Sequence, residues 1–412
     1  MKLLLISAAF PPMKSGGADY AMRMAEHMVA QGIEVHVLTG VGAQTGATKY
    51  SVKPIIKEWA WTDAFVIENV VKELQPDVVD IHFTGWVYND NPMITFAPFL
   101  IRKAAPTAHI SVHIESLGGV RRELSNPCDA AIRWCVSQLV GRDRINYEYG
   151  NLLRDSDSLV FLNERDLNEL VSLVPEVRDK ALLTPPPPIM PISAPLTPEQ
   201  VHSIREQYGM GGREIMLAFY GYIYPGKGVE TLLSAVEKLA PKANVGLVLA
   251  GGLPEEKVLQ REGQPHYLED LKSAGRAVSD RLFWTGYSPP DSDVPSKILR
   301  ACDICVLPFE RGVMLNNSSF SFAAMHGVPI ITTKGEHTES VFVHDQNAVL
   351  LPPGNASALA DEILSLANDA IKRQRLSAGS LALAHERFNW EKTVRETVAF
   401  WQRSKKSSLS IA

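Results

Sequence analysis

Short, unbroken runs of apolar residues alternate along the chain with longer stretches whose apolar residues recur at helical spacing. The first run covers residues 3–7, the helical stretch 18–31 and the next run 33–38. Short continuous runs are typical of strands buried on both faces, and their alternation with amphipathic helices is typical of a parallel sheet. The pattern therefore predicts an α/β fold. Further strands are expected at residues 78–82, 109–113, 159–162, 215–220, 245–250, 282–284, 304–307 and 329–332.

Four consecutive prolines, ending at Pro188, interrupt this alternation, and they cannot belong to a helix or a central strand. We therefore predict two Rossmann-like, doubly wound domains, residues 1–188 and 189–389, that face a central cleft. Ligands of such sheets bind at the carboxyl ends of the strands. The segment 390–412 is predicted to pack back on the first domain. Helices near the C-terminus are expected at residues 357–368, 372–385 and 390–405.

Composition narrows the class of protein. The chain has 412 residues, 45% of them hydrophobic, and a formal net charge of −5, which argues against a nucleic-acid partner. The apolar run near the N-terminus, Leu3 to Ile6, is shorter than the roughly 7–15 residues of a secretory signal. No stretch approaches the roughly 18 apolar residues of a membrane span. We expect a cytoplasmic protein.

Two glycine-rich turns precede helices and are candidates for phosphate binding. Gly16 and Gly17 end the first turn, where backbone amides and the helix dipole favour an anion. The spacing is not G-x-G-x-x-G, which disfavours a dinucleotide oxidoreductase. In the second domain, the turn from Gly221 carries Lys227, whose ammonium group suits a diphosphate.

From Gly221 through Leu233 the sequence resembles the G-R-x-x-x-x-K-G-x-x-x-L segment of retaining GT-B glycosyltransferases of family 4. The loop around Glu339 resembles the G-x-P-E motif of that family, with Thr338 in place of the proline. The resemblance covers most of the chain and is strongest from about residue 215 to 355. Other matching segments are 245–252, 306–308, 327–333 and 347–353.

The resemblance implies the fold, the reaction and several site residues. It implies a GT-B fold and a retaining transferase that takes its sugar from a nucleotide-diphosphate sugar, with a UDP-sugar as the first expectation. The acceptor would be a glycan, a lipid-linked sugar or a small molecule. Lys227 is implied to contact the donor diphosphate, and His113 to lie near the donor sugar, although a strand-end core histidine is the competing interpretation. The other residues implied to bind the donor are Gly16, Gly17, Gly221, Tyr222 and Glu339.

The sequence departs from the family pattern at charged positions. Tyr222 occupies the slot of the usual arginine, and Met314 and Phe322 occupy the slots of two glutamates. A sub-branch of the family, reading G-V-x-x-R-R-x-S, resembles this segment better. Its arginine pair is replaced here by Asn316 and Asn317.

Polar residues remain where these charges are absent. Asn316, Asn317, Ser318 and Ser319 lead into a helix expected at residues 320–326, and we predict that they cap it. The free amides of that helix would hold a phosphate without an arginine. Glu310 is the nearest carboxylate and the candidate partner of a sugar hydroxyl.

Motifs for metal or redox chemistry are interpreted as structural. Asp155-Ser156-Asp157 and Asp291-Ser292-Asp293 are D-x-D triplets, but the first reads as a turn, and no metal or cofactor is expected. Cys302 and Cys305 have C-x-x-C spacing but fit small buried thiols better.

A locally basic stretch near Trp134 could face an anionic acceptor or a membrane surface. Because acidic residues are interspersed, ordinary helix surface is the preferred interpretation, and peripheral membrane contact stays as an alternative. The basic residues are Arg121, Arg122, Arg133, Arg142 and Arg144.

An active retaining transferase is the function these features favour, with the nucleotide bound mainly to the second domain and the acceptor mainly to the first. A catalytically silent GT-B protein that binds a sugar or a partner is the alternative, motivated by the missing charges. A nucleotide-sugar epimerase ranks third. The oligomeric state is not predicted.

Overall fold

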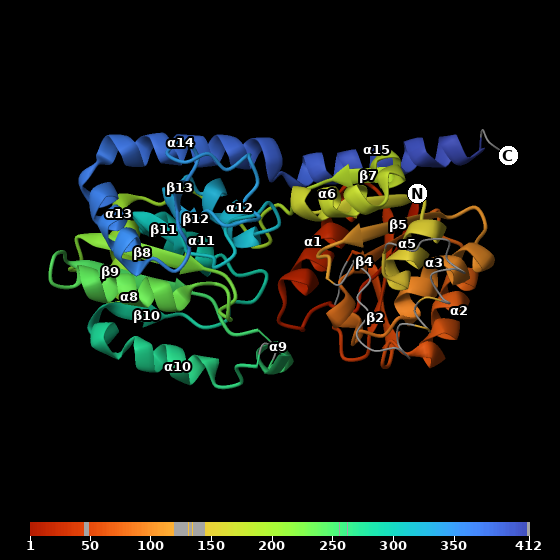
Figure 1. Cartoon of the computed structure of the whole chain (residues 1–412), viewed down its shortest axis with the longest axis horizontal. Helices are drawn as coiled ribbons and strands as arrows, with labels where there is room; N and C mark the ends of the chain where they lie inside the picture. Colours follow the sequence, from red (N-terminus) through yellow and green to blue (C-terminus); the bar gives the residue numbers. More distant parts are fainter. Residues whose placement is uncertain are drawn as a thin grey trace. The chain divides into compact units, whose positions relative to one another are not determined.

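The chain folds into two α/β units in a computed structural model (Figure 1). Unit 1 comprises Met1–Met13, Gly17–Pro185 and Trp390–Ala412, and unit 2 comprises Lys14–Gly16 and Pro186–Asn389. The structure describes residues 1–44, 49–118, 131, 134, 145–254, 256–261 and 263–409.

Unit 1 is built on a seven-stranded sheet in the order β3-β2-β1-β4-β5-β6-β7. Every neighbouring pair of strands is parallel. The connections reverse direction between β1 and β4, which is the switch point where sheets of this type bind ligands. The strands are β1 Lys2–Ile6, β2 Glu34–Gly40, β3 Ser51–Ile56, β4 Val78–Phe83, β5 His109–Ile114, β6 Ser158–Phe161 and β7 Ala181–Leu183.

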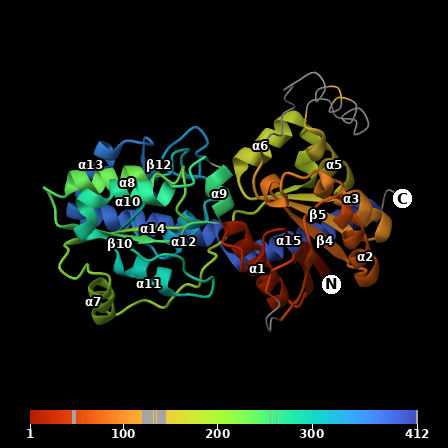
Figure 2. The same cartoon turned by 90° about the horizontal axis from the view of Figure 1, so that it is seen from below.

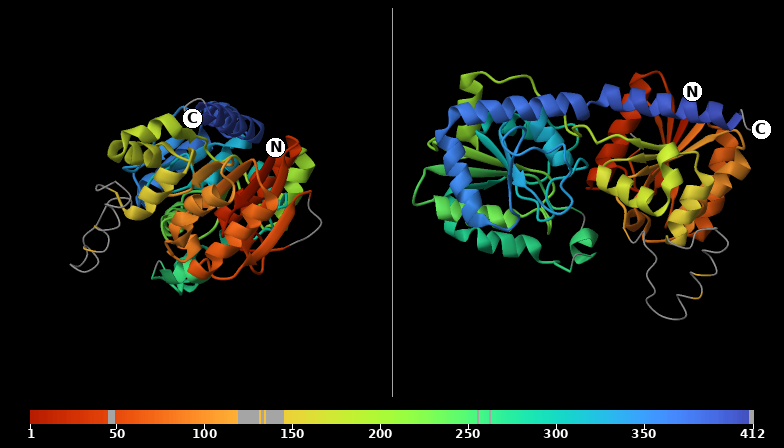
Figure 3. Two further views of the ribbon diagram at one scale, coloured as in Figure 1. Left: turned by 90° about the vertical axis from the view of Figure 1, so that its right-hand side faces the viewer. Right: turned by 45° about the horizontal axis from the view of Figure 1, so that its top comes forward.

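Helices cover both faces of this sheet. The apolar core under α2, α3 and α5 includes Ile67, Ile101, Leu152 and the strand residues facing them. On the other face, α1 lies over β4 and β5, and α15 packs along β5 and β6 (Figure 3). The helices are α1 Gly16–Ala30, α2 Ala64–Leu74, α3 Met93–Ala104, α5 Tyr147–Asp155, α6 Glu164–Leu173 and α15 Trp390–Leu409, with 3-10 turns η1 Trp61–Asp63, η2 Gly85–Tyr88 and η3 Pro175–Lys180.

Unit 2 repeats the arrangement with a six-stranded parallel sheet in the order β10-β9-β8-β11-β12-β13. Its switch point lies between β8 and β11. The prediction of two doubly wound parallel sheets is therefore confirmed. The strands are β8 Ile215–Tyr220, β9 Val245–Ala250, β10 Leu282–Trp284, β11 Ile304–Leu307, β12 Ile330–Thr333 and β13 Val349–Leu351.

The helices of unit 2 also form two layers. One layer contains α8 with α10 and α13, and the other contains α7 and α11, which pack side by side, together with α12 and α14 (Figure 2). The helices are α7 Pro198–Gln207, α8 Val229–Leu239, α9 Glu256–Arg261, α10 Tyr267–Ala274, α11 Val294–Ala301, α12 Ser318–Met325, α13 Ala356–Asn368 and α14 Ala370–Arg387, with the 3-10 turn η4 Arg276–Arg281.

Candidate functional site

The turn that follows β8 lies against the first residues of α12. Gly221 has φ +127°, and a Cβ atom there would come within 2.4 Å of the Ser319 Oγ. A Cβ atom on Gly251, which follows β9, would come within 1.9 Å of the Gly221 carbonyl oxygen. Glycine is therefore required at both positions, and the close packing holds the carboxyl ends of β8 and β9 beside the N-terminus of α12.

Lys227 sits in the same turn, next to the segment that follows β11. Its Nζ lies 5.0 Å from the ring centroids of both Tyr224 and Phe309, so the ammonium group is within cation–π range of two aromatic rings. The Gly226 carbonyl accepts a hydrogen bond of 3.0 Å from the Glu310 amide. The structure thus brings Lys227 and Glu310 together from two neighbouring strands. Glu310 is exposed and Lys227 is half-buried.

The polar residues before α12 do not all act as predicted. Asn317 is the N-cap residue, but its Oδ1 accepts a 2.7 Å hydrogen bond from the Met314 amide rather than from the helix. The amides of Ser318 and Ser319 donate to no acceptor in the part of the chain that the structure describes. The Oδ1 of Asn316 is buried without a hydrogen-bond partner among those residues. The prediction that these four residues cap a helix at residues 320–326 was wrong, because α12 begins at Ser318 and the Asn317 side chain does not cap it. The amides expected to be free are free among the described residues.

Glu339 is buried, and its carboxylate accepts a short hydrogen bond from the Leu315 amide. Thr338 closes the preceding loop, because its Oγ1 accepts a 3.0 Å hydrogen bond from the Gly335 amide. The Glu339 contact ties the loop after β12 to the segment before α12, whereas the Thr338 contact lies within that loop. Glu339 therefore shapes the backbone of this site in the structure, and its contact with a donor stays a prediction.

The residues at the positions of the missing single arginine and the two missing glutamates are aromatic or apolar. Phe322 is fully buried, with its ring centroid 4.3 Å from that of Tyr220 and 4.6 Å from that of His326. The Tyr222 ring faces the Tyr287 ring at a centroid distance of 6.4 Å and an interplanar angle of 29°. Phe322 is thus part of the core of unit 2.

In unit 1, the first turn of α1 lies against a carboxylate that the sequence analysis did not single out. A Cβ atom on Gly17 would come within 2.8 Å of the Glu115 Oε2. Glu115 follows β5, and its Oε2 accepts a 3.2 Å hydrogen bond from the Thr84 hydroxyl. A Cβ atom on Gly16 would have no neighbouring atom within 4 Å.

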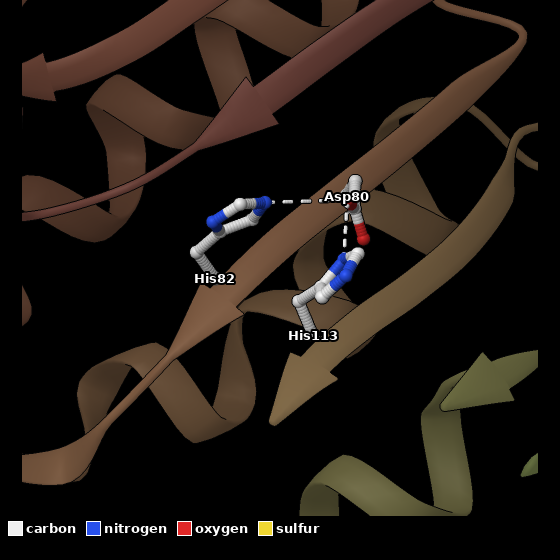
Figure 4. A group of neighbouring side chains, drawn as sticks. All are labelled: Asp80, His82 and His113. Atoms are coloured by element: carbon white, nitrogen blue, oxygen red, sulfur yellow. Dashed lines mark hydrogen bonds and ion pairs between the residues drawn. The ribbon is translucent and has the colours of Figure 1, made fainter. Parts of the chain in front are cut away.

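His113 belongs to a buried charged cluster on β4 and β5 (Figure 4). The His113 Nδ1 donates a 2.9 Å hydrogen bond to the Asp80 Oδ2, and its Nε2 lies 3.3 Å from the Tyr20 hydroxyl. The His82 Nε2 stands 3.5 Å from the same Asp80 oxygen, and its Nδ1 stands 3.4 Å from the Glu115 Oε1. His82 therefore links Asp80 to Glu115.

Parallel pairing explains why these side chains meet. Asp80 and His82 are two residues apart and share one face of β4, while His113 lies opposite His82 in the register of β5. His113 is completely buried, so its predicted role near a donor sugar is not visible in the structure. Sequence reasoning missed Asp80, His82 and Glu115. The signal was present as Asp80-x-His82 on one predicted strand and His113-x-Glu115 at the end of the next.

The cluster shifts the protonation of its members. Burial alone would lower the pKa of His82, but the carboxylates of Asp80 and Glu115 raise that pKa to about 9. Burial would likewise raise the pKa of Asp80, but the two histidines hold that pKa well below its usual range. His82 is therefore a cation at neutral pH. Asp80, His82 and His113 place potential ligand atoms within 4.8 Å of one another. His113 is hydrogen-bonded to Asp80, and His82 is in ion-pair range of the same carboxylate.

Two aspartates of the D-x-D triplets pair with other groups of the protein. The Asp157 carboxylate accepts hydrogen bonds from Arg102 and from the Ile110 amide, and the Asp293 carboxylate pairs with Lys297. Burial raises the pKa of the Cys302 and Cys305 thiols.

The arginines of the predicted basic stretch, Arg121, Arg122, Arg133, Arg142 and Arg144, lie outside the described residues, whereas Trp134 is described and exposed. None of the described helices is both long enough and apolar enough to cross a bilayer.

Comparison with known proteins points to one class of enzyme. Residues 200–380 match the sequence model of the family described as "Glycosyl transferases group 1". An uncharacterized glycosyltransferase of Methanocaldococcus jannaschii is 24% identical, over 97% of each chain. The D-inositol 3-phosphate glycosyltransferase of Corynebacterium glutamicum is 22% identical, over 96% of this chain and 95% of that one.

A similar solved structure is that of Anabaena HepE in complex with UDP and glucose. It superposes with a TM-score of 0.69 at 14% identity, over 97% of this chain and 99% of that chain. The fold is therefore GT-B, with two Rossmann-like units. Together the comparisons support a glycosyltransferase that uses a nucleotide sugar.

Proposed function

We propose that this protein is a retaining glycosyltransferase that moves a sugar from a UDP-sugar to a hydroxyl group of an acceptor. The donor diphosphate binds unit 2, between the turn after β8 and the N-terminus of α12. The acceptor binds unit 1. UDP is the preferred nucleotide because HepE, which shares the fold, binds UDP.

The observation that carries this proposal is the contact between Gly221 and Ser319. It places the turn that bears Lys227 beside the unbonded amides of Ser318 and Ser319, at the switch point between β8 and β11. One ammonium group and the positive end of a helix would together face a diphosphate. They supply the charge that the absent arginine pair would have supplied.

Both groups stabilise the leaving group. As the bond between the anomeric carbon and the diphosphate breaks, negative charge grows on the diphosphate oxygens. In this proposal Lys227 and the α12 amides stabilise that charge, and such contacts are worth most in the transition state. None of the predicted site residues reads as an enzymic nucleophile, so we favour attack by the acceptor on the same face that the diphosphate leaves. Glu310, next to Gly226, is the candidate partner of a donor-sugar hydroxyl.

The acceptor class to test first comes from a relative. The Corynebacterium glutamicum protein is named for transfer to D-inositol 3-phosphate, a ring with several hydroxyl groups. Polyhydroxylated rings are therefore the first candidate acceptors for this chain.

Thermal-shift titration against UDP, GDP, ADP, TDP and CMP tests the donor class. We expect UDP to raise the melting temperature, because a ligand at a hundredfold excess over its Kd adds about 2.7 kcal/mol of stability. Lys227→Met should lose the shift. Lys238→Met is the matched control. Lys238 is exposed in the last turn of α8, about 14 Å along the helix axis from Val229, the first residue of α8.

Two results would count against the proposal. One is the absence of a shift with every nucleotide, which would favour the silent binding protein. The other is an equal UDP shift in wild type and Lys227→Met, which would remove Lys227 from the site.

A further inference from the structure

We propose that Glu115 is a substrate-binding residue of unit 1 that accepts hydrogen bonds from a hydroxyl or ammonium group of the acceptor. His82 and Thr84 are the positioning residues that hold its carboxylate. This inference rests on the proposed function, because it assigns the acceptor to a named group.

The carboxylate of Glu115 is held from two sides and is still accessible. The Thr84 hydroxyl donates to Oε2 at 3.2 Å, and His82 lies 3.4 Å from Oε1. An ionised carboxylate offers about four acceptor positions, so roughly half remain for a ligand. The side chain is 16% exposed, whereas His82 is 1% exposed. Its fixed orientation and partial exposure are what a binding carboxylate requires.

The position of Glu115 decides which ligand chemistry fits. Its Oε2 lies against Gly17, the second residue of α1, where a Cβ atom would come within 2.8 Å. The carboxylate therefore lies beside the first turn of α1. A phosphate placed at this turn would meet a like charge, whereas a hydroxyl or ammonium group would donate to that charge. The first glycine turn is thus an acceptor subsite rather than a phosphate subsite.

The buried charges beneath Glu115 support a functional role. His82 bridges Glu115 and the fully buried Asp80, so the carboxylate is the outer end of a charged chain that runs into the core. Burying charged groups is costly unless they are paired, and this chain pairs them while fixing one carboxylate at the sheet edge. A surface glutamate with only a structural role does not need such support.

Saturation-transfer NMR with three sugars tests the assignment on the full-length protein. The probes are D-glucosamine, D-glucose and D-glucose 6-phosphate, each with and without saturating UDP. We expect wild type to bind glucosamine about tenfold more tightly than glucose, and glucose 6-phosphate no more tightly than glucose. Glu115→Gln keeps the size of the side chain and should abolish the glucosamine preference while leaving the UDP thermal shift unchanged.

Substitutions at Thr84 and His82 separate positioning from folding. Thr84→Ser keeps the hydroxyl and should keep the preference, whereas Thr84→Val and His82→Gln should reduce it. Equal sugar preferences in wild type and Glu115→Gln, tighter binding of glucose 6-phosphate, or no binding of any sugar would overturn the inference. If one of these results comes with a normal UDP thermal shift, the proposed function still stands. If the UDP thermal shift is absent but the glucosamine preference is as expected, only the proposed function is refuted.

Discussion

At the scale of single residues, the central feature is a cation enclosed by two carboxylates. His82 is buried between Asp80 and Glu115, and the two carboxylates raise its pKa by more than burial lowers it. The pKa of His82 is about 9 in the folded chain and near 6.5 in an unfolded one. This difference couples the protonation of one side chain to the stability of unit 1.

The first prediction concerns the pH dependence of that stability. Because the folded pKa lies above the unfolded one, the stabilisation is complete below pH 6.5 and is lost as the pH rises through about 9. Urea unfolding should lose roughly 3 kcal/mol between these limits in wild type, and His82→Gln should flatten the decline. His202→Gln, on the exposed surface of α7, is the control. A decline of equal slope in wild type and His82→Gln would contradict this assignment.

The pH window isolates His82 from another buried histidine. Burial lowers the pKa of His326 to about 4, so its effect has the opposite sign and appears as the pH falls below 6.5. Measurements above pH 6.5 therefore report on His82 and not on His326.

At the scale of elements, hydrophobic patterning predicted the central strands and one edge strand, β10, and missed the other three edge strands. Strands β8, β9, β10 and β11 have the predicted bounds. β8, β9 and β11 are unbroken apolar runs buried between helices, and β10 is a partly buried apolar run of three residues. The missed strands have weak signals of their own. β3 contains Pro54 and lies at a sheet edge, and β7 and β13 have three residues each. A short edge strand forms because its neighbour is already in place.

Site residues were likewise found where their signal is local in the sequence and missed where it depends on strand pairing. Lys227 and Gly221 lie in one local turn, so their spacing alone marks them. Asp80, His82 and Glu115 meet only through the register of β4 with β5. The side chain of Asn317 bonds back to Met314, because a local turn competes with helix capping for the same oxygen.

The second prediction concerns the turn between β8 and α8. Gly228 has φ +71°, and a Cβ atom there would lie 2.0 Å from the Pro308 carbonyl oxygen. Gly228→Ala should therefore cost roughly 2 kcal/mol or more in urea unfolding and should weaken UDP binding, because the turn bearing Lys227 must shift.

A matched substitution at Gly209 separates the strain of a positive φ from the steric clash with Pro308. Gly209 has φ +65° with no atom within 4 Å of a built Cβ, so Gly209→Ala should cost only about 1 kcal/mol. Equal costs for the two substitutions would show that the contact with Pro308 does not restrain the turn.

At the scale of the whole molecule, the chain leaves unit 2 at Asn389 and completes unit 1 with α15. Trp390 stacks on His27 at 4.7 Å between ring centroids and on Tyr20 at 5.6 Å, and Trp401 is 1% exposed. The last helix is therefore part of the core of the first unit, although it follows the second unit in sequence.

The third prediction follows from this arrangement. Trp401→Ala should destabilise unit 1 by roughly 3–5 kcal/mol, the usual cost of truncating a buried aromatic side chain. Hydrogen–deuterium exchange should rise in the strands of unit 1 and stay unchanged in those of unit 2. Ile371→Ala, at a position 78% exposed on α14, is the control. Increased exchange spread equally over both units would show that α15 does not belong to one of them.

The most direct test of the whole account is NMR observation of turnover by the full-length protein. UDP-glucose, UDP-galactose and UDP-N-acetylglucosamine are each mixed with D-inositol 3-phosphate, myo-inositol and glucosamine as acceptors. We predict release of UDP from one donor and a product that keeps the anomeric configuration of that donor, with Lys227→Met slower by at least about a hundredfold. UDP binding without any release would identify a silent binding protein, and an inverted product would contradict the retaining mechanism.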